Sequence, residues 1–445
     1  MIVEINCLSQ YIKVDLQNME NVIHGFDTSG AIFSNNVPAW LVARRDDALK
    51  RLLEMGFPTD AEEIWRYSRV GELLERDLVL RRDLPKLAKL EELGTDFPDD
   101  LADLAASGKL VLMLKPGSAS IYEPNGSSEA VVSRALDLGS SFLENIELSS
   151  DFFGLYTEAY SEDVYVIDIP KDTVLSGPIV VIVSGVGTSQ TFLPKISLKL
   201  GDGSVAQLIE AHVGGATDSF VASSTDLYLG DRARLGHFQI QNMNADAYHV
   251  ANINSYLQRE ANYQYGAFSF GGHYARVRCE NHLLGQASKA YLKAAYFADG
   301  NQMLDFRTLQ DHLAPNTFSD LLFKGAVAGT SHSVYSGLVR IEEGAIKSDA
   351  FQTNRNLVLS SGARADSVPN LDIRENNVRC SHASAVGPID PELIFYLESR
   401  GIDPRTGEQL IVRGFFNEIL EGLSSQAVSQ LVGKFVDQKL EGLKK

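Results

Sequence analysis

The stretch that decides the fold is residues 229–261, which read LGDRARLGHFQIQNMNADAYHVANINSYLQREA. It begins and ends with the same corner: an apolar residue, three polar or turn-compatible residues, and a small residue four positions on, at Leu229/Ala233 and Leu257/Ala261. A small residue just past a corner lets stacked backbones approach closely. Outward from this stretch the same pairing recurs at Leu200/Ser204, Leu284/Ser288, Ile341/Ala345 and Leu359/Ala363.

The spacing of these corners predicts a solenoid. The intervals between successive first members are 29, 28, 27, 57 and 18 residues. Three intervals near 28 indicate one coil per repeat, the interval of 57 indicates two coils with one corner disguised, and the interval of 18 indicates a shortened final coil. Each coil of a parallel β-helix buries its apolar face only by stacking on the next. We therefore predict a mainly β protein with a right-handed parallel β-helix over residues 109–388. A β-sandwich, with turns every ~8–12 residues, is the alternative.

Helical patterns flank this region. In a predicted N-terminal helical domain, residues 1–108, one buried stripe stops before Gly56-Phe57-Pro58 and consists of Trp40, Leu41, Ala48, Leu49, Leu52 and Leu53. A second helical element is expected at residues 61–67. Trp65 and Tyr67 are expected to be core aromatics. In a predicted C-terminal helical domain, residues 389–445, an antiparallel helix pair is expected from two stripes: Phe415, Phe416, Ile419, Leu420 and Leu423, then Val428, Leu431, Val432, Phe435 and Val436. These stripes either cover the end of the solenoid or offer an apolar surface to a partner.

Composition narrows the functional classes. A formal net charge of −18 over 445 residues argues against nucleic acid or an anionic membrane as the main partner. No apolar run approaches the roughly 18–20 residues of a membrane helix, and no signal segment is visible. The three cysteines, Cys7, Cys279 and Cys380, make no disulfide framework and fit a reducing cytoplasm. Three thiolates also cannot complete a four-thiolate cluster site.

No catalytic motif is present. The chain has no Gly-Lys-Ser/Thr run, so it lacks a P-loop and an ATP site of that kind. A β-helix carbohydrate enzyme would need acidic pairs that converge on one face. The pairs Asp226/Asp231 and Asp305/Asp311 show no repeated register, so this class is the weaker alternative to a protein without catalysis.

Cys380 and His382 are the candidate metal ligands. Residues i and i+2 of a strand project from one face, so a thiol and an imidazole could meet one metal there. Soft thiolate with imidazole suits iron–sulfur or zinc ligation. The alternative is two packed strand residues. Elsewhere, Cys279 is expected to be a buried small residue, and four glutamines are expected to line a polar file between coils: Gln207, Gln239, Gln241 and Gln264.

The segment around this pair resembles a known family. Pro369, Leu371 and Ile373 alternate on a strand, Cys380-Ser381-His382 follows, and Asp390 opens a run that reads DPELIFYLESRG. This order is similar to the SufD branch of the SufB/SufD family, the scaffold proteins of sulfur-mobilisation iron–sulfur cluster assembly. Pro38-Ala39-Trp40-Leu41 also resembles the N-terminal helical module of that branch.

The resemblance implies a function. It implies a β-helix core, a heterodimer with a SufB-like protein through the C-terminal coils, and a SufC-like ABC ATPase docked on the C-terminal helices at Phe415, Phe416, Ile419 and Leu420. Cys380 and His382 would face the SufB-like partner and share a transient iron–sulfur cluster with it. Asn354 stands where SufB-type proteins have a cysteine, which favours the SufD-like over the SufB-like role. A SufB-like homodimeric scaffold remains the alternative.

Overall fold

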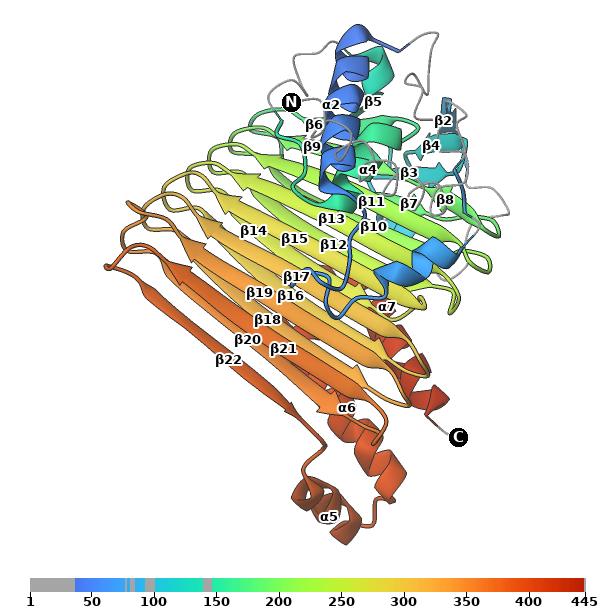
Figure 1. The fold of residues 1–445 in the computed structure, drawn as a ribbon, viewed down its shortest axis with the longest axis vertical. Coiled ribbons are helices and arrows are strands. Elements are labelled where there is room, and N and C mark those ends of the chain that lie inside the picture. Colours follow the sequence, from blue (N-terminus) through green and yellow to red (C-terminus); the bar gives the residue numbers. More distant parts are fainter. Residues whose placement is uncertain (1–36, 77, 81–84, 93–100, 139–145, 444–445) are drawn as a thin grey trace, which may run out of the picture.

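The chain winds as a solenoid in which, from residue 195 on, successive strands alternate between two sheets of mainly parallel strands (Figure 1). The computed structural model describes residues 37–76, 78–80, 85–92, 101–138 and 146–443, so Cys7 lies outside the described residues. Sheet A runs in the spatial order β5 (Val131–Arg134), β6 (Val164–Ile169), β9 (Lys195–Leu200), β11 (Phe220–Leu229), β13 (Tyr248–Leu257), β15 (Tyr274–Leu283), β17 (Met303–His312), β19 (His332–Ile341) and β21 (Arg364–Ile373), with β8 (Gln190–Phe192) beside β11 and β1 (Val79–Leu80) beside β8.

Sheet B faces it. Its order is β2 (Leu87–Leu90), β4 (Ser118–Tyr122), β3 (Leu110–Lys115), β7 (Ile179–Val183), β10 (Val205–Gly214), β12 (Arg234–Met243), β14 (Asn262–Ser269), β16 (Lys289–Ala298), β18 (Phe318–Val327), β20 (Asp349–Val358) and β22 (Arg379–Gly387). The pairing Arg234↔Asn262↔Lys289 repeats after 28 and then 27 residues, as the corner spacing requires. The prediction of a parallel β-helix is confirmed.

The corners from sheet A to sheet B share one backbone conformation. Gly203, Arg232, Glu260, Ala287 and Asn316 all have φ between 58° and 68°. A left-handed conformation is uncommon for residues other than glycine, so its recurrence marks equivalent corners. Each of these N–H groups donates to a carbonyl of the next coil, as from Arg232 to Arg259 at 2.8 Å. Asn316 lies at a corner within the 57-residue interval, where the sequence shows no recognisable corner pattern. That interval therefore does contain two coils.

Two details of the predicted register are wrong. The corner after Ile341 is longer than the others, and its left-handed residue is Lys347, with φ 59°, so the small buried residue that matches Ala233 is Ser348 rather than Ala345. Leu359/Ala363 lies on the opposite side of the solenoid, between β20 and β21. The final coil is therefore not shortened, because Asp349 pairs with Arg379, 30 residues on.

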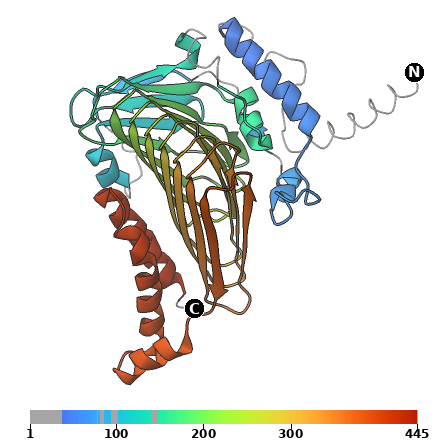
Figure 2. The ribbon, with the colours of Figure 1, turned by 90° about the vertical axis from the view of Figure 1, so that its left-hand side faces the viewer.

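Three apolar layers hold the molecule together. The first fills the interior between the sheets and includes Leu208, Ile253 and Leu292. The second lies outside sheet B, under α6 (Pro404–Leu420) and α7 (Gln426–Gly442), where Figure 2 shows the two helices along one face. The third lies outside sheet A, under α2 (Ala39–Met55) and α4 (Phe152–Tyr160). The C-terminal stripes therefore cover the face of sheet B rather than the end of the solenoid.

The N-terminal segment packs on sheet A. Helix α2 ends at Gly56, whose φ of 73° fits the predicted stop. Trp65 is buried, with the Arg276 guanidinium 3.7 Å from its ring centroid, whereas Tyr67 is exposed and the prediction of a second core aromatic is wrong. Two parts of the prediction are wrong: residues 61–67 form turns rather than a second helix, and Leu53 of the predicted buried stripe is exposed. The remaining helical elements are η1 (Val70–Glu75), α3 (Ala102–Ser107), η3 (Ala135–Asp137) and α5 (Pro391–Ser399).

The two ends of the solenoid differ. At the N-terminal end, four-residue strands β2 and β5 lie at the sheet margins, and β5 runs antiparallel to β6. At the C-terminal end, β21 and β22 are 10 and 9 residues long and lie at the margins of their sheets. Among the described residues, none of the helices combines the length and the apolar character needed to cross a membrane.

Candidate metal and partner site at the last coil

Both candidate ligands lie on β22, the last strand of sheet B. Cys380 pairs with Ala350 of β20, and His382 pairs with Gln352. Side chains two apart on a strand share a face, so the thiol and the imidazole lie on the same side of β22. Arg379 anchors the start of the strand through two hydrogen bonds to the Asp349 carboxylate, at 2.8 and 2.6 Å. The strand is therefore fixed on its inner side and unpaired on its outer side.

The two side chains have different surroundings. Cys380 is half-buried and packs against the apolar cluster of Val339, Ile341, Ala345 and Ala350, inside the last coil. Burial raises the pKa of its thiol, so the thiol carries its proton until a metal displaces it. His382 is exposed. The imidazole is therefore available at the surface, whereas the thiol is partly covered by the apolar cluster.

Two ligands do not complete a metal site. Over the described residues, no group of three or more His, Cys, Asp and Glu side chains is arranged to hold a metal ion. Iron–sulfur clusters and structural zinc commonly take four protein ligands. Any cluster bound at Cys380 and His382 as cargo would therefore draw its remaining ligands from another chain or molecule.

Asn354 lies deeper inside the solenoid than this pair. Its amide N–H donates to the Tyr296 hydroxyl at 3.0 Å, and its amide oxygen accepts from Asn356 at 2.8 Å. The side chain is buried, and it pairs in register with Ser384 rather than with a candidate ligand. The amide nitrogen links β20 to β16, and the amide oxygen holds Asn356 of the same strand, so Asn354 has a structural role here.

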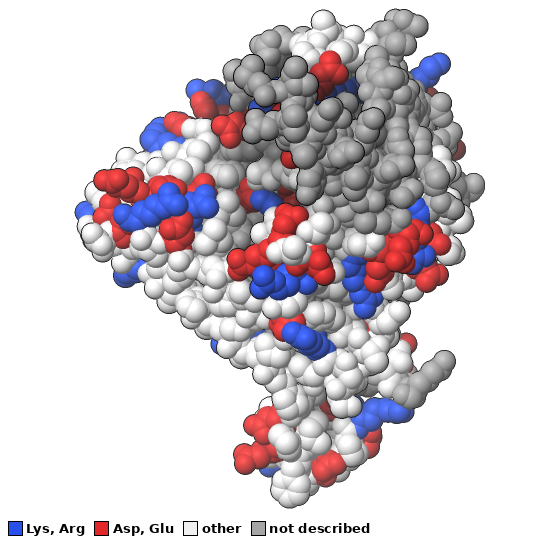
Figure 3. All heavy atoms as spheres, viewed as in Figure 1, with Lys and Arg blue, Asp and Glu red and all other residues white. Residues whose placement is uncertain are grey.

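Apolar side chains are exposed around the free edge. They are Leu371 and Ile373 of β21, Val386 of β22, and Leu393, Phe395 and Tyr396 of α5. Figure 3 shows few charged side chains along the lower left edge of the solenoid, where β21 and β22 lie. Exposed apolar patches of this kind mark interaction surfaces. The sequence predicted only that these residues lie on strands or helices. It could not predict their exposure, because whether a strand lies at the edge of a sheet depends on the whole stack of coils.

The four residues predicted to bind the ATPase divide into two pairs. Phe416 and Ile419 are fully buried against sheet B, with the Phe416 ring centroid 6.3 Å from that of Phe297. Phe415 and Leu420 are only partly buried. Lys324 of β18 fixes this part of α6, because its ammonium donates to the Phe415 carbonyl at 2.9 Å and pairs with Glu418. Contact by Phe416 or Ile419 with a partner would require α6 to leave the sheet.

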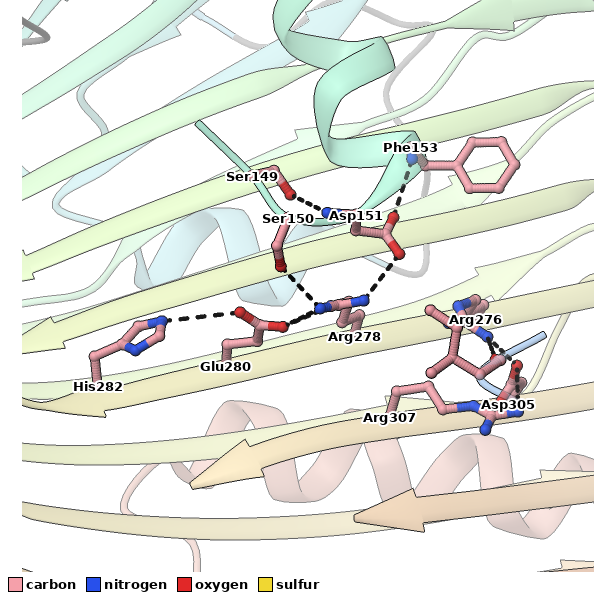
Figure 4. A network of polar contacts seen from close by, with 11 residues as sticks. Ser149, Ser150, Asp151, Phe153, Arg276, Arg278, Glu280, His282, Asp305 and Arg307 are labelled. Carbon is pink, nitrogen blue, oxygen red and sulfur yellow. Dashed lines mark hydrogen bonds and ion pairs between the residues drawn. The ribbon is translucent and has the colours of Figure 1, made fainter. Parts of the chain in front are cut away.

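A polar network covers the outer face of sheet A (Figure 4). Asp151 caps α4 by accepting from the Phe153 N–H at 3.0 Å and also accepts from Arg278 at 3.2 Å. Asp305 is buried between Arg276 and Arg307, each 2.7 Å from one of its oxygens. These guanidinium groups lower the pKa of Asp305 despite the burial that opposes them.

Each carboxylate considered for a carbohydrate enzyme contacts a basic side chain. Asp305 is held by two arginines, Asp311 by His282 at 3.2 Å, Asp226 by Lys195 at 3.0 Å and Asp231 by Arg259 at 3.0 Å. A general acid needs a carboxyl group that keeps its proton near neutral pH. The arrangement gives no support to that alternative.

Sequence reasoning missed a buried charged group between the sheets. The Glu210 carboxylate lies 2.7 Å from His237 Nε2 and accepts a hydrogen bond from Thr225 at 3.1 Å. Hydrogen bonds and charge from the histidines outweigh burial and lower the pKa of Glu210. Of the four glutamines predicted to line the interior, Gln239 and Gln241 are buried there, while Gln207 and Gln264 lie on the outer face of sheet B. The difference arises because successive side chains of a strand point to opposite faces of the sheet, so the position of a glutamine within its strand decides whether it lies inside or outside.

Fold and site together define a two-sheet β-solenoid with a paired cysteine and histidine on its free edge strand. The sequence profile described as "SUF system FeS cluster assembly, SufBD core domain" matches residues 182–415. The chain belongs to this family, and the resemblance seen in its sequence is confirmed.

Two of the three curated relatives below carry iron–sulfur cluster assembly in their names. The chain is 33% identical over 283 residues to an iron–sulfur cluster assembly SufBD family protein of Mycobacterium bovis, covering 62% of this chain and 70% of that protein. It is 27% identical over 403 residues to the iron–sulfur cluster assembly protein SufD of Escherichia coli, covering 88% and 92%. It is 22% identical over 421 residues to the chloroplastic protein ABCI7 of Arabidopsis thaliana, covering 90% and 86%.

Proposed function

We propose that this chain is a SufD-type subunit of a cytoplasmic complex that builds iron–sulfur clusters. It forms a scaffold with a SufB-like protein, is driven by a SufC-like ABC ATPase and has no catalysis of its own. The observation that carries the proposal is the free edge of β22, which bears Cys380 and His382 beside exposed apolar side chains. The cluster is cargo, held transiently by these two residues and by ligands of the partner.

The partner strand is expected to add to β22 rather than to β21. The Arg379 N–H donates inward to Ser348, so the alternating pattern points the N–H groups of Cys380, His382, Ser384 and Val386 outward. On β21 the Arg364 N–H donates inward to Ser331, which gives Pro369 an outward position with no N–H to offer. Strand addition needs a row of free donors and acceptors, and only β22 has the complete row.

The ATPase is proposed to dock where α5 projects from the end of α6. Phe395 is 71% exposed, and Leu393 and Tyr396 of the same helix are also exposed. Beside α5 is a cavity of about 550 Å³ whose apolar lining includes Ile394 and Leu440. Of the four residues predicted from sequence, Phe415 and Leu420 remain available in part. An apolar side chain of the ATPase would fill the cavity.

The test uses the chain co-expressed with its cognate SufB-like protein and ABC ATPase. Ser384→Pro removes one outward donor from β22 without touching an inward hydrogen bond. We expect it to reduce recovery of the SufB-like protein and to leave recovery of the ATPase unchanged. Ser367→Pro, which removes an outward donor from β21, is the matched control and should leave both recoveries unchanged.

Two results would change the proposal. Full recovery of the SufB-like protein with the Ser384→Pro chain, shown by melting to be folded, would exclude strand addition at β22. Cluster assembly by this chain alone as a homodimer would favour the SufB-like alternative. In the expected result, anaerobic reconstitution with iron and sulfide yields a stable cluster only in the complex.

A further inference from the structure

A groove on the outer face of sheet B belongs to none of the surfaces described above. It lies between the corners of β10, β12, β14 and β16 and the connection from α6 to α7. Its volume is about 780 Å³, and its polar lining includes Gln207, Arg234, Asn262, Gln264, Lys289 and Ser424. The size and the side chains suit a small polar ligand rather than a protein segment.

Two cations frame the floor of this groove. Arg234, Asn262 and Lys289 are directly opposite one another on three adjacent strands. With neighbouring strands ~4.8 Å apart, the Cα atoms of Arg234 and Lys289 are about 9.6 Å apart, with the Asn262 amide between them. Within the described residues, neither cation forms an ion pair. This contrasts with the outer face of sheet A, where Arg276, Arg278 and Arg307 all meet carboxylates.

The acidic group of the groove is already neutralised. Glu260 lies at the rim, but its carboxylate is 2.9 Å from Arg259. Arg259 also neutralises Asp231 of the neighbouring corner, at 3.0 Å. The groove is therefore locally positive on a chain whose net charge is −18. Two unpaired cations side by side repel each other unless an anion separates them.

Amide and hydroxyl groups complete the lining. Gln207 donates to the Ser424 hydroxyl at 3.5 Å, and Gln264 lies beyond Asn262 on the same strand. Ser424 precedes Ser425, the N-cap of the 17-residue helix α7, so the positive end of that helix dipole adds to the field of the two cations.

We propose that this groove binds a small phosphate-bearing molecule, with Arg234 and Lys289 each holding one of two linked phosphate groups and Asn262 donating between them. A guanidinium provides paired donors and an ammonium provides a point charge, and both are common phosphate ligands. Because the two cations come from strands on either side of Asn262, each can hold a separate phosphate group, so we propose a diphosphate rather than a single phosphate or a carboxylate. The site is independent of the edge of β22.

The test measures binding of pyrophosphate to the full-length chain by calorimetry, with inorganic phosphate and succinate as comparison ligands. We expect pyrophosphate to bind more tightly than either. The R234Q/K289Q double variant removes both charges and leaves neutral amide side chains that can still donate hydrogen bonds. It should lower pyrophosphate affinity at least tenfold, because each charge-assisted hydrogen bond contributes more than a neutral one.

The matched control is K50Q/R66Q, which removes the same charge from two exposed residues of the N-terminal segment. It should bind pyrophosphate like the unaltered chain. Equal weakening in both double variants, or no pyrophosphate binding by the unaltered chain, would overturn the site. Succinate binding as tight as pyrophosphate binding would overturn the assignment to phosphate. Unchanged melting temperatures would show that both variants are folded.

Discussion

Cys380 and His382 differ in what they can give a metal, although they share one strand face. The exposed imidazole can bind a metal at the rim of the last coil. The thiol is half-buried, and because burial raises its pKa, it gives up its proton less readily. A metal that binds this face from outside therefore meets His382 first. In the proposed complex, the SufB-like protein would have to cover Cys380 further to enclose a cluster.

His382→Ala should lower cluster formation in the complex with the SufB-like protein roughly tenfold or more, without separating the subunits. Loss of a ligand weakens the metal site, while the apolar contact and strand pairing remain. Visible absorption after anaerobic reconstitution and size-exclusion chromatography would measure the two effects. An equal loss with Cys380→Ser identifies the thiol as a second ligand, and a smaller loss identifies it as interface lining. Unaltered cluster yield with His382→Ala would exclude the metal role.

Acid stability should depend on buried histidines. His312 bonds Thr317 and Ser319 at 2.7 and 2.9 Å, and burial lowers its pKa to about 4. In the unfolded chain a histidine has a pKa of about 6.5 and binds a proton first, so the free energy of unfolding falls as pH drops from 6.5 towards 4. The loss from His312 alone is roughly 3 kcal/mol. Denaturant unfolding of His312→Gln, compared with the unaltered chain from pH 7 to 4.5, should show a flatter dependence; an identical slope would contradict this.

At the scale of the element, the corner is the unit of this fold, and its chemistry explains what sequence could predict. Leu229 and Ala233 identify a corner because every coil needs an apolar residue that faces the interior of the solenoid and a small residue where its corner packs against the corner of the next coil. Leu359 and Ala363 satisfy the same need on the other side of the coil, so chemistry alone could not separate the two series. An insertion before Lys347 moved the small position to Ser348, which only the left-handed backbone reveals.

Overpacking tests the corner directly. Ala233 is fully buried beneath the neighbouring corner, so Ala233→Leu should lower the free energy of unfolding by ~1–3 kcal/mol. Ala363 is only partly buried at the last coil, so Ala363→Leu should cost less. Denaturant titration of both variants measures the difference. Equal costs would mean that the last coil is as closely covered as the middle of the stack.

The C-terminal helices offer a second comparison at this scale. Phe416→Ala should destabilise the chain by ~3–5 kcal/mol, because its ring is buried against sheet B. Phe395→Ala should change stability by about 0.5 kcal/mol or less, since the ring is mostly exposed, but should reduce recovery of the ATPase. Chemical unfolding and co-purification separate the two. Retained ATPase binding by the Phe395→Ala chain would remove α5 from the docking site.

At the scale of the whole molecule, sequence predicted the layers but not what each layer faces. The helical stripes at Phe416 and Val432 predicted that these helices bury an apolar face, and only the fold shows that this face packs on sheet B. The alternation of Leu371 and Ile373 reported a strand, and only the completed stack shows it to be at a margin. Position along a solenoid is fixed by all the coils before it, so edges and faces are not local properties.

The asymmetry of the two ends has a consequence for stoichiometry. The N-terminal margins are the four-residue strands β2 and β5, while β22 offers one long row of free donors. A monomer with two free edge strands could add a further copy at each end and form a fibre. A monomer with one free edge strand can pair only once. When two such monomers pair through their free edge strands, neither has a second free edge of this kind, so the assembly ends as a dimer. In the proposed complex, assembly would therefore stop at two subunits, and the cluster would be shared by those two.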